Sequence, residues 1–426
     1  MNRNYQGVAM SDARMDADAP GDLPQTGVTT HYSDLRKVLL LVSLLAAWVL
    51  ANADRIAMSL SIIPMRGEFG LDAREAGLVL SSFYVTYALM NLAAGWLADK
   101  FGSRRVLVGC VAAWSVFTSF TGFAWSFASL IGIRGLFGIG EGGFAPSSSV
   151  TIAEAWPKEK RARPKSLVIG AAFVGNAIGS GWIAAMIHAH GWRFAYHALG
   201  ALGVVMAIVL WLVIKESPAR DPARKRLRGG VRQLFRTPVM RRTSLIFFFA
   251  NMLHVGLTSW MPSYLVQTKG IHLVKAGLVA SVPFVCAFAC LNFVGWLLDR
   301  YGHGRERFFL AGGSFAMMLC MVAMVLSTRT WTLMVFYTLL SMSYTFVYAT
   351  VFAIPLKHLP DSTVGTAAGV VNFGGQVASA ISPAAMGFLI ASYGGSYVPA
   401  FVFLIAAGLA CFIVSATWTN RGSQAA

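Results

Sequence analysis

Two stretches of this chain repeat one pattern: Gly95-Trp-Leu-Ala-Asp99-Lys-Phe-Gly102-Ser-Arg-Arg105 returns as Gly295-Trp-Leu-Leu-Asp299-Arg-Tyr-Gly302-His-Gly-Arg305. Each copy follows a long apolar stretch and precedes another. A repeat at this distance in an apolar chain is typical of a duplicated membrane half, as in many secondary transporters. The spacing puts a carboxylate at the end of one helix and a guanidinium just before the next. Such charges can latch helix ends together in one conformation and release them in another, so the predicted gating residues are Asp99, Arg105, Asp299 and Arg305.

The composition is that of a membrane protein. Of the 426 residues, 56% are hydrophobic and only 12% are charged, whereas soluble domains carry roughly a quarter charged residues. Apolar windows of about 20 residues predict twelve spans, at 38–63, 77–98, 106–124, 130–155, 167–188, 196–214, 245–267, 276–298, 308–327, 332–356, 366–391 and 398–418. The predicted fold class is therefore an all-α membrane protein with twelve transmembrane helices in two pseudo-symmetric six-helix halves.

The basic residues have a definite location. The formal net charge is +17, and the positive charges gather after the second, fourth, sixth and eighth predicted spans, at 100–105, 158–165, 215–242 and 300–307. The opposite loops are poor in net charge, as at 125–129. This asymmetry is the positive-inside pattern, which places both termini in the cytoplasm. An orientation signal explains the basic excess, so we expect the lipid bilayer and no nucleic acid as a partner.

The same pattern divides the chain into two halves joined by a basic linker. We predict a cytoplasmic tail, an N-terminal six-helix half, a cytoplasmic linker, a C-terminal six-helix half and a second cytoplasmic tail, at residues 1–37, 38–214, 215–243, 244–418 and 419–426 respectively. The N-terminal tail has no cleavage signal, so the first span is expected to stay as an anchor. All five cysteines fall within predicted spans without disulfide or zinc spacing. We expect no cofactor, no metal and no enzymatic activity, since no nucleophile–base pattern occurs.

Ionisable residues in mid-span are few, and four of them lie in the first and fourth spans: Asp54, Arg55, Arg134 and Glu141. Each charge at mid-bilayer costs roughly 2.5–3.5 kcal/mol even on the lenient insertion scale, so the four must face one another or a wet cavity. Arg134 and Glu141 are two helical turns apart, hence on one face about 10 Å apart along the axis. That distance is too long for a direct pair, so each is expected to engage the first span.

The residue types suggest a chemistry for these four charges. Arginine offers a planar fork of donors that matches an anion bidentately, and a desolvated carboxyl group can take up and release a proton. Two cations and two acids are the minimum parts of a proton–anion symporter. We therefore predict that Asp54 and Glu141 couple protons and that Arg55 and Arg134 bind the anion. The alternative is that all four form inert salt bridges between the two spans.

The second half carries mostly neutral polar groups in mid-span: His254, Tyr264, Asn292, Tyr344, Tyr348, Asn372 and Gln376. Asn372 and Gln376 lie one helical turn apart, so they share a face. Their amides can hydrogen-bond a hydroxyl or oxyanion group of a small ligand. We predict both as substrate-binding residues, with charge coupling placed in the first half and recognition shared with the second.

These residues resemble one branch of the major facilitator superfamily, the anion:cation symporters, which include bacterial hexonate and hexuronate transporters. The resemblance covers residues 36–418 and rests on the repeated loop pattern and on five shorter motifs. These are Asn52-Ala-Asp54-Arg55, Arg134-Gly-x-x-Gly-x-x-Glu141, Trp156-Pro157 with Glu159 and Arg161, Trp260-x-Pro262-x-Tyr264-Leu265, and Asn372-Phe373 with Gln376. The resemblance implies the major facilitator fold, and it implies the same division of roles between the two acids and the two arginines.

The resemblance adds one further site residue and one departure. It implies that Tyr87 in the second span contacts the substrate, together with the amide of Gln376. Sugar-acid transporters of this branch carry a glutamine in the fifth span, whereas this chain reads Phe173-Val-Gly175-Asn176 there. The departure counts against a sugar acid.

The sequence thus predicts a proton-coupled importer of a small organic anion, working by alternating access as a monomer in a bacterial cytoplasmic membrane. Sugar acids, small dicarboxylates, aromatic carboxylates and sulfonates such as sulfoacetate all fit two arginines and a few amides. An anion exchanger or facilitator without net proton flux stays open as an alternative. A transporter-like sensor is a further alternative, although the basic linker shows no output module.

Overall fold

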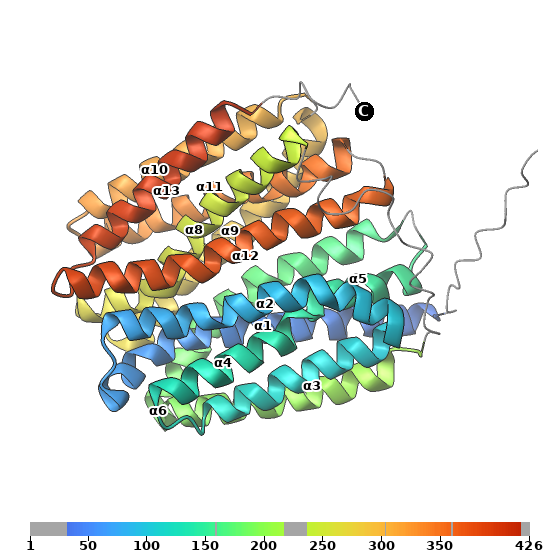
Figure 1. Cartoon of the computed structure of the whole chain (residues 1–426), viewed down its shortest axis with the longest axis horizontal. Coiled ribbons are helices and arrows are strands. Elements are labelled where there is room, and N and C mark those ends of the chain that lie inside the picture. Colours follow the sequence, from blue (N-terminus) through green and yellow to red (C-terminus); the bar gives the residue numbers. More distant parts are fainter. Residues whose placement is uncertain (1–31, 158–159, 217–236, 303, 359–360, 419–426) are drawn as a thin grey trace, which may run out of the picture.

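The computed structural model describes five stretches of the chain, and Figure 1 shows their arrangement. Residues 1–31 of the predicted N-terminal tail, the whole predicted C-terminal tail and most of the predicted basic linker lie outside the described residues. Helix α1 (Asp34–Phe69) begins inside the segment predicted as the N-terminal tail. The described stretches are 32–157, 160–216, 237–302, 304–358 and 361–418.

The first half consists of six spans. Two of them make up α6, which consists of two helices that meet at a kink at Gly191, where φ is 84°. Another span is divided at Gly143 into α4 and α5. The helices of this half are α1 (Asp34–Phe69), α2 (Ala73–Phe101), α3 (Ser103–Thr121), α4 (Phe127–Gly142), α5 (Phe144–Ala155) and α6 (Ala162–Val213). Every span predicted for this half therefore coincides with one helix, with α4 and α5 together, or with one of the two parts of α6.

The second half repeats this arrangement with six separate helices. They are α8 (Pro238–Gln267), α9 (Leu273–Tyr301), α10 (Glu306–Leu326), α11 (Thr330–His358), α12 (Asp361–Ser392) and α13 (Val398–Ala416). The described residues contain no strand, and eight of the described helices are by themselves long and apolar enough to cross a membrane. Helix α8 begins at Pro238, inside the segment predicted as linker, because proline at the first helical position is pre-organised for the helix.

Successive spans run in opposite directions, so the bundle has two ends. We call the end where α1 begins and α13 ends the terminal end, and the opposite end the far end (Figure 1). At the terminal end, Arg36 at the start of α1 donates a hydrogen bond to the Val213 carbonyl at the end of α6, at 2.9 Å. Arg242 near the start of α8 likewise donates to the Thr417 carbonyl just after α13, at 2.7 Å. In each half the first and last helices are thus joined at this end.

Tight connections define the far end. Gly70 ends α1 in the left-handed conformation, with φ at 66°, which glycine adopts without steric cost. Asp72 then caps α2: its side chain accepts from the Glu75 backbone at 2.7 Å, and the Glu75 side chain accepts from the Asp72 backbone at 3.1 Å. This capping box satisfies two of the free amide groups at the start of a helix.

The two halves meet closely along α2 and α12 and along α6 and α9. At Gly77 of α2, an added Cβ would lie 2.6 Å from the Pro383 carbonyl oxygen and 3.1 Å from the Gly387 Cα of α12. Ser81 of α2 accepts a hydrogen bond from the Ala384 backbone amide at 2.9 Å. Small residues of this kind let helix backbones approach closely in a membrane protein.

A polar contact also joins the halves at the far end. Arg66 of α1 donates to the Gln267 side-chain oxygen of α8 at 3.1 Å, and the Tyr397 hydroxyl donates to the same oxygen at 3.0 Å. Contacts between α1 and α8 thus close the far end of the bundle.

Substituting Gly77 with alanine is expected to destabilise the protein by about 1–3 kcal/mol, the usual cost of overpacking. The added methyl group meets backbone atoms of α12, which cannot rotate away. Gly109→Ala in α3 is the matched control, because an added Cβ there meets nothing within 4 Å. Thermal unfolding in detergent measures both variants, and equal melting temperatures would contradict the close packing of α2 against α12.

Candidate functional site

Two ion pairs connect α1 to α4. The Arg55 Nε lies 2.6 Å from the Glu141 Oε1, and the Arg134 Nη1 lies 3.6 Å from the Asp54 Oδ1. Asp54 and Arg55 are consecutive on α1, so each helix contributes one acid and one base. The expectation that Arg134 and Glu141 engage the first span separately is confirmed. The transport roles assigned to these four residues stay predictions.

These charges are deeply buried. Asp54 and Arg134 are each 2% exposed and Glu141 is fully buried, while Arg55 is partly buried. Thr118 of α3 donates a hydrogen bond to the Asp54 Oδ2. Burying an ion pair costs desolvation energy that the attraction between the charges often fails to repay. Four buried charges are therefore a poor device for stability.

Several polar atoms of the paired residues form no hydrogen bond. Among the described residues, no hydrogen-bond partner exists for five buried charged-group atoms: Asp54 Oδ1, Arg55 Nη2, Arg134 Nε, Arg134 Nη1 and Glu141 Oε2. A buried polar group without a partner costs about 1–3 kcal/mol, and more when it is charged. Each arginine thus keeps a donor for an anion, and Glu141 keeps an oxygen for a proton, whereas the Asp54 oxygen without a hydrogen bond is the one that faces Arg134.

Aromatic rings surround both guanidinium groups. The Arg55 Cζ lies 4.7 Å from the ring centroid of Tyr87, 5.2 Å from that of Phe83 and 5.4 Å from that of Trp48. The Arg134 Cζ lies 4.3 Å from the ring centroid of Phe137. Rings at these distances attract a cation through their faces. Tyr87, predicted to contact substrate, therefore lies against Arg55, one of the two arginines predicted to bind the anion.

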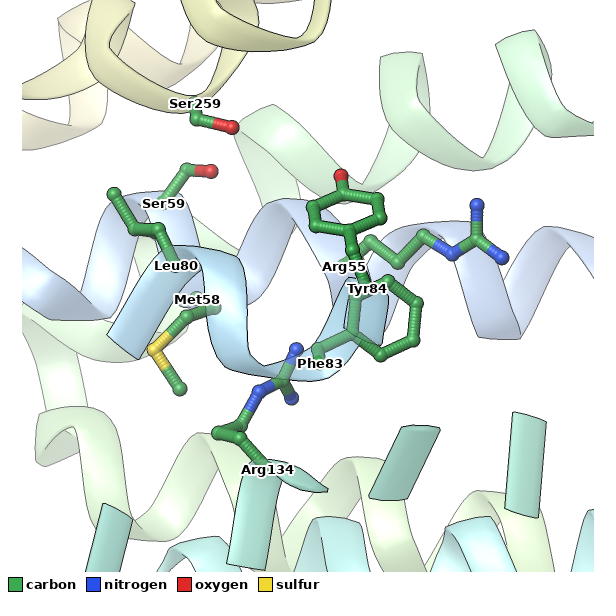
Figure 2. Close-up of a pocket in the computed structure, with 8 residues that line it drawn as sticks. All are labelled: Arg55, Met58, Ser59, Leu80, Phe83, Tyr84, Arg134 and Ser259. Atoms are coloured by element: carbon green, nitrogen blue, oxygen red, sulfur yellow. The ribbon is translucent and has the colours of Figure 1, made fainter. Parts of the chain in front are cut away.

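A small cavity adjoins the two arginines, and Figure 2 shows its lining. Most of the lining comes from α1, α2 and α4, and Ser259 of α8 approaches from the second half above Ser59 of α1. The lining residues are Arg55, Met58, Ser59, Leu80, Phe83, Tyr84, Arg134 and Ser259. The cavity therefore lies between the halves, where an occupant would touch both.

The two predicted amides of α12 lie elsewhere. The Gln376 Nε2 lies 3.4 Å from the Asn372 Oδ1, which confirms that they share a face. Asn372 also donates to the Asn91 Oδ1 of α2 at 3.3 Å. Neither amide lines the cavity of Figure 2. The Gln376 Oε1 is buried without a partner among the described residues, so it is the free acceptor of the pair.

A second polar group in the C-terminal half was missed in the sequence. Asn251 of α8 accepts from the Tyr344 hydroxyl at 2.9 Å and donates to the Ser379 Oγ at 2.8 Å. The His254 ring stacks on Tyr344 with centroids 4.0 Å apart and planes 3° apart. The signal that could have identified it in the sequence is Asn251 itself, an amide within the seventh predicted span. This network ties α8, α11 and α12 together.

The predicted gating residues make few contacts among the described residues. Arg105 pairs with Glu216, and both side chains are largely exposed. Asp299 is exposed near the end of α9, and Arg305 immediately precedes α10. The side chain of Asp99 lies outside the described part of the chain. Their gating role stays a prediction.

Comparison with known proteins identifies the family. The Major Facilitator Superfamily matches residues 39–383. The chain is 30% identical over 385 residues to a protein of Cupriavidus necator named "Probable sulfoacetate transporter", covering 85% of this chain and 88% of that protein. It is 28% identical to a hexuronate transporter of Bacillus subtilis, covering 88% and 92%, and 26% identical to a D-galactonate transporter of Escherichia coli, covering 88% and 93%.

Solved structures share the fold. A bacterial homolog of the human lysosomal transporter Spinster, in an inward-facing and occupied conformation, superposes with a TM-score of 0.78 at 19% identity. The alignment covers 93% of this chain and all of that chain. The predicted major facilitator fold is thereby confirmed. The chain belongs to the Major Facilitator Superfamily, and it is a multi-pass membrane transporter and not an enzyme.

Proposed function

We propose that this protein imports a small organic anion together with protons. The observation that carries the proposal is the pair of crossed ion pairs between α1 and α4. Each guanidinium group is held by a carboxylate and still keeps a buried donor without a partner among the described residues. The carboxylates therefore compete with any anion for the same two arginines.

This competition supplies a coupling mechanism. When Asp54 and Glu141 carry protons, their attraction for the arginines falls and an anion binds to Arg55 and Arg134 instead. When the protons leave, the carboxylates reclaim the guanidinium groups and displace the anion. The described pairing, with Arg55 on Glu141 at 2.6 Å, fits the deprotonated and anion-free stage of this cycle.

The orientation follows from the charge pattern. We propose that the terminal end faces the cytoplasm of a bacterial cell and the far end faces outward, because the basic loops lie at the terminal end. The contacts between α1 and α8 then close the outer side of the protein in this arrangement. Asp99, Arg105, Asp299 and Arg305 are proposed to hold the cytoplasmic side when the far end opens.

The relatives support an organic anion as the cargo. Their names specify sulfoacetate, hexuronate and D-galactonate, all of which carry a carboxylate or sulfonate group. Two guanidinium groups match such an anion through planar, bidentate hydrogen bonds. The cavity is small, and besides the two arginines its polar lining consists of the hydroxyl groups of Ser59, Tyr84 and Ser259. The small size favours a compact anion.

Uptake into proteoliposomes tests the proposal. Radiolabelled sulfoacetate, galactonate, glucuronate, succinate and benzoate are offered with and without an inward proton gradient. We expect gradient-driven accumulation of at least one anion, abolished by a protonophore. Accumulation that is unchanged by the protonophore would contradict proton symport and indicate anion exchange instead. Absence of flux with every anion would contradict the proposed cargo class.

A further inference from the structure

Two histidines from different halves meet at the far end. His188 lies near the end of the first part of α6, and His272 immediately precedes α9. Their ring centroids are 4.5 Å apart and their planes are nearly perpendicular, at 89°. Both side chains are exposed, so an ion from the solution can reach them. The sequence spacing gave no sign of this meeting.

The pair lies at one of the two close contacts between the halves. An added Cβ at Gly277 of α9 would lie 2.5 Å from the Ala184 Cβ of α6, and one at Gly181 would lie 2.8 Å from the Leu278 Cδ2. His188 follows Ala184 by one helical turn, toward the far end. The two imidazoles therefore extend the α6–α9 contact to the surface.

The geometry suits a metal ion. Zinc binds imidazole nitrogen at about 2.0–2.1 Å in a tetrahedral arrangement, which puts the centroids of two coordinating rings roughly 5 Å apart. The observed separation of 4.5 Å is close to that value. Both rings are exposed, so small rotations can aim one nitrogen of each at a common ion. Imidazole also suits nickel and copper.

We propose that His188 and His272 bind a divalent transition-metal ion, with Zn²⁺ as the probe, and that the bound ion clamps the two halves together at the far end. No group of three histidine, cysteine or acidic residues occurs among the described residues. Water therefore completes the coordination, and binding is of modest affinity. Because each half supplies one ligand, the ion binds the closed far end better than the open one and shifts the population toward it.

Metal binding is measured first without any transport assay. The full-length protein is purified with a tag that lacks histidine, and its thermal unfolding is followed with increasing ZnCl₂ and with EDTA. A ligand that binds only the folded state raises the melting temperature, here by about 2 °C at saturating metal. His188→Ala and His272→Ala are each expected to abolish the shift. His190→Ala is the matched control, because His190 lies two residues away and packs against Phe194 with centroids 4.8 Å apart.

Transport then tests the clamp. Zinc is expected to slow uptake of a transported anion several-fold in the wild type and in His190→Ala, and to have no effect in His188→Ala. The site would be overturned if zinc still raised the melting temperature of both His188→Ala and His272→Ala. It would also be overturned if zinc failed to raise the melting temperature of His190→Ala. A shift without inhibition would overturn the clamp alone. The unfolding measurement does not depend on the cargo, so a failure of this site and a failure of the proposed symport are distinguishable.

Discussion

Glu141→Gln is expected to abolish proton-driven accumulation while leaving exchange of labelled for unlabelled anion measurable. With one pH unit across the membrane, one coupled proton supplies about 1.4 kcal/mol, which is roughly tenfold accumulation. A glutamine keeps the shape of the side chain and an acceptor for Arg55 but cannot carry the proton. The variant should therefore equilibrate the anion without concentrating it.

The measurement is proteoliposome uptake at a fixed pH gradient, followed by counterflow without a gradient. Glu154→Gln is the matched control, because Glu154 is also a buried acid and accepts from Ser103 at 2.5 Å, away from the paired charges. Accumulation by Glu141→Gln that a protonophore still abolishes would show that Glu141 does not carry the coupled proton.

Arg55→Lys is expected to raise the KM for the anion by about tenfold or more. A hydrogen bond to a charged group contributes about 1.5–3 kcal/mol, and each 1.4 kcal/mol is a factor of ten in affinity. The guanidinium group gives its Nε to Glu141 and keeps Nη2 free, so it can hold a carboxylate on one edge and a ligand on another. Lysine places one compact charge there and cannot present two edges.

Initial uptake rates over a range of anion concentrations measure this effect. Arg74→Lys is the control, since Arg74 also lies over an aromatic ring, 5.0 Å from the centroid of Phe388, near the far end. A lower maximal rate with unchanged KM would favour the alternative in which the four buried charges are structural.

Most of the fold could be predicted because lipid imposes a simple rule on the sequence. A span must be apolar for about 20 residues, and each of the twelve predicted spans coincides with helix in the structure. The break at Gly191 falls between the predicted spans 167–188 and 196–214, because glycine accepts a positive φ that other residues avoid.

The four charged residues of the candidate site could be predicted from the sequence, but their arrangement into ion pairs could not. The cost of burying charge required Asp54, Arg55, Arg134 and Glu141 to face one another or water. Which acid meets which arginine depends on the rotation and depth of two helices, and sequence spacing does not fix either. The Thr118 donor to Asp54 and the approach of Ser259 come from other helices and carry no signal of their own.

Asp54 and Arg55 are consecutive on α1, so their side chains leave the helix about 100° apart. The two ion pairs to α4 are of opposite order, acid to base and base to acid. Exchanging the partners would bring Asp54 against Glu141 and Arg55 against Arg134, which are like charges. The arrangement therefore specifies how α1 is rotated relative to α4.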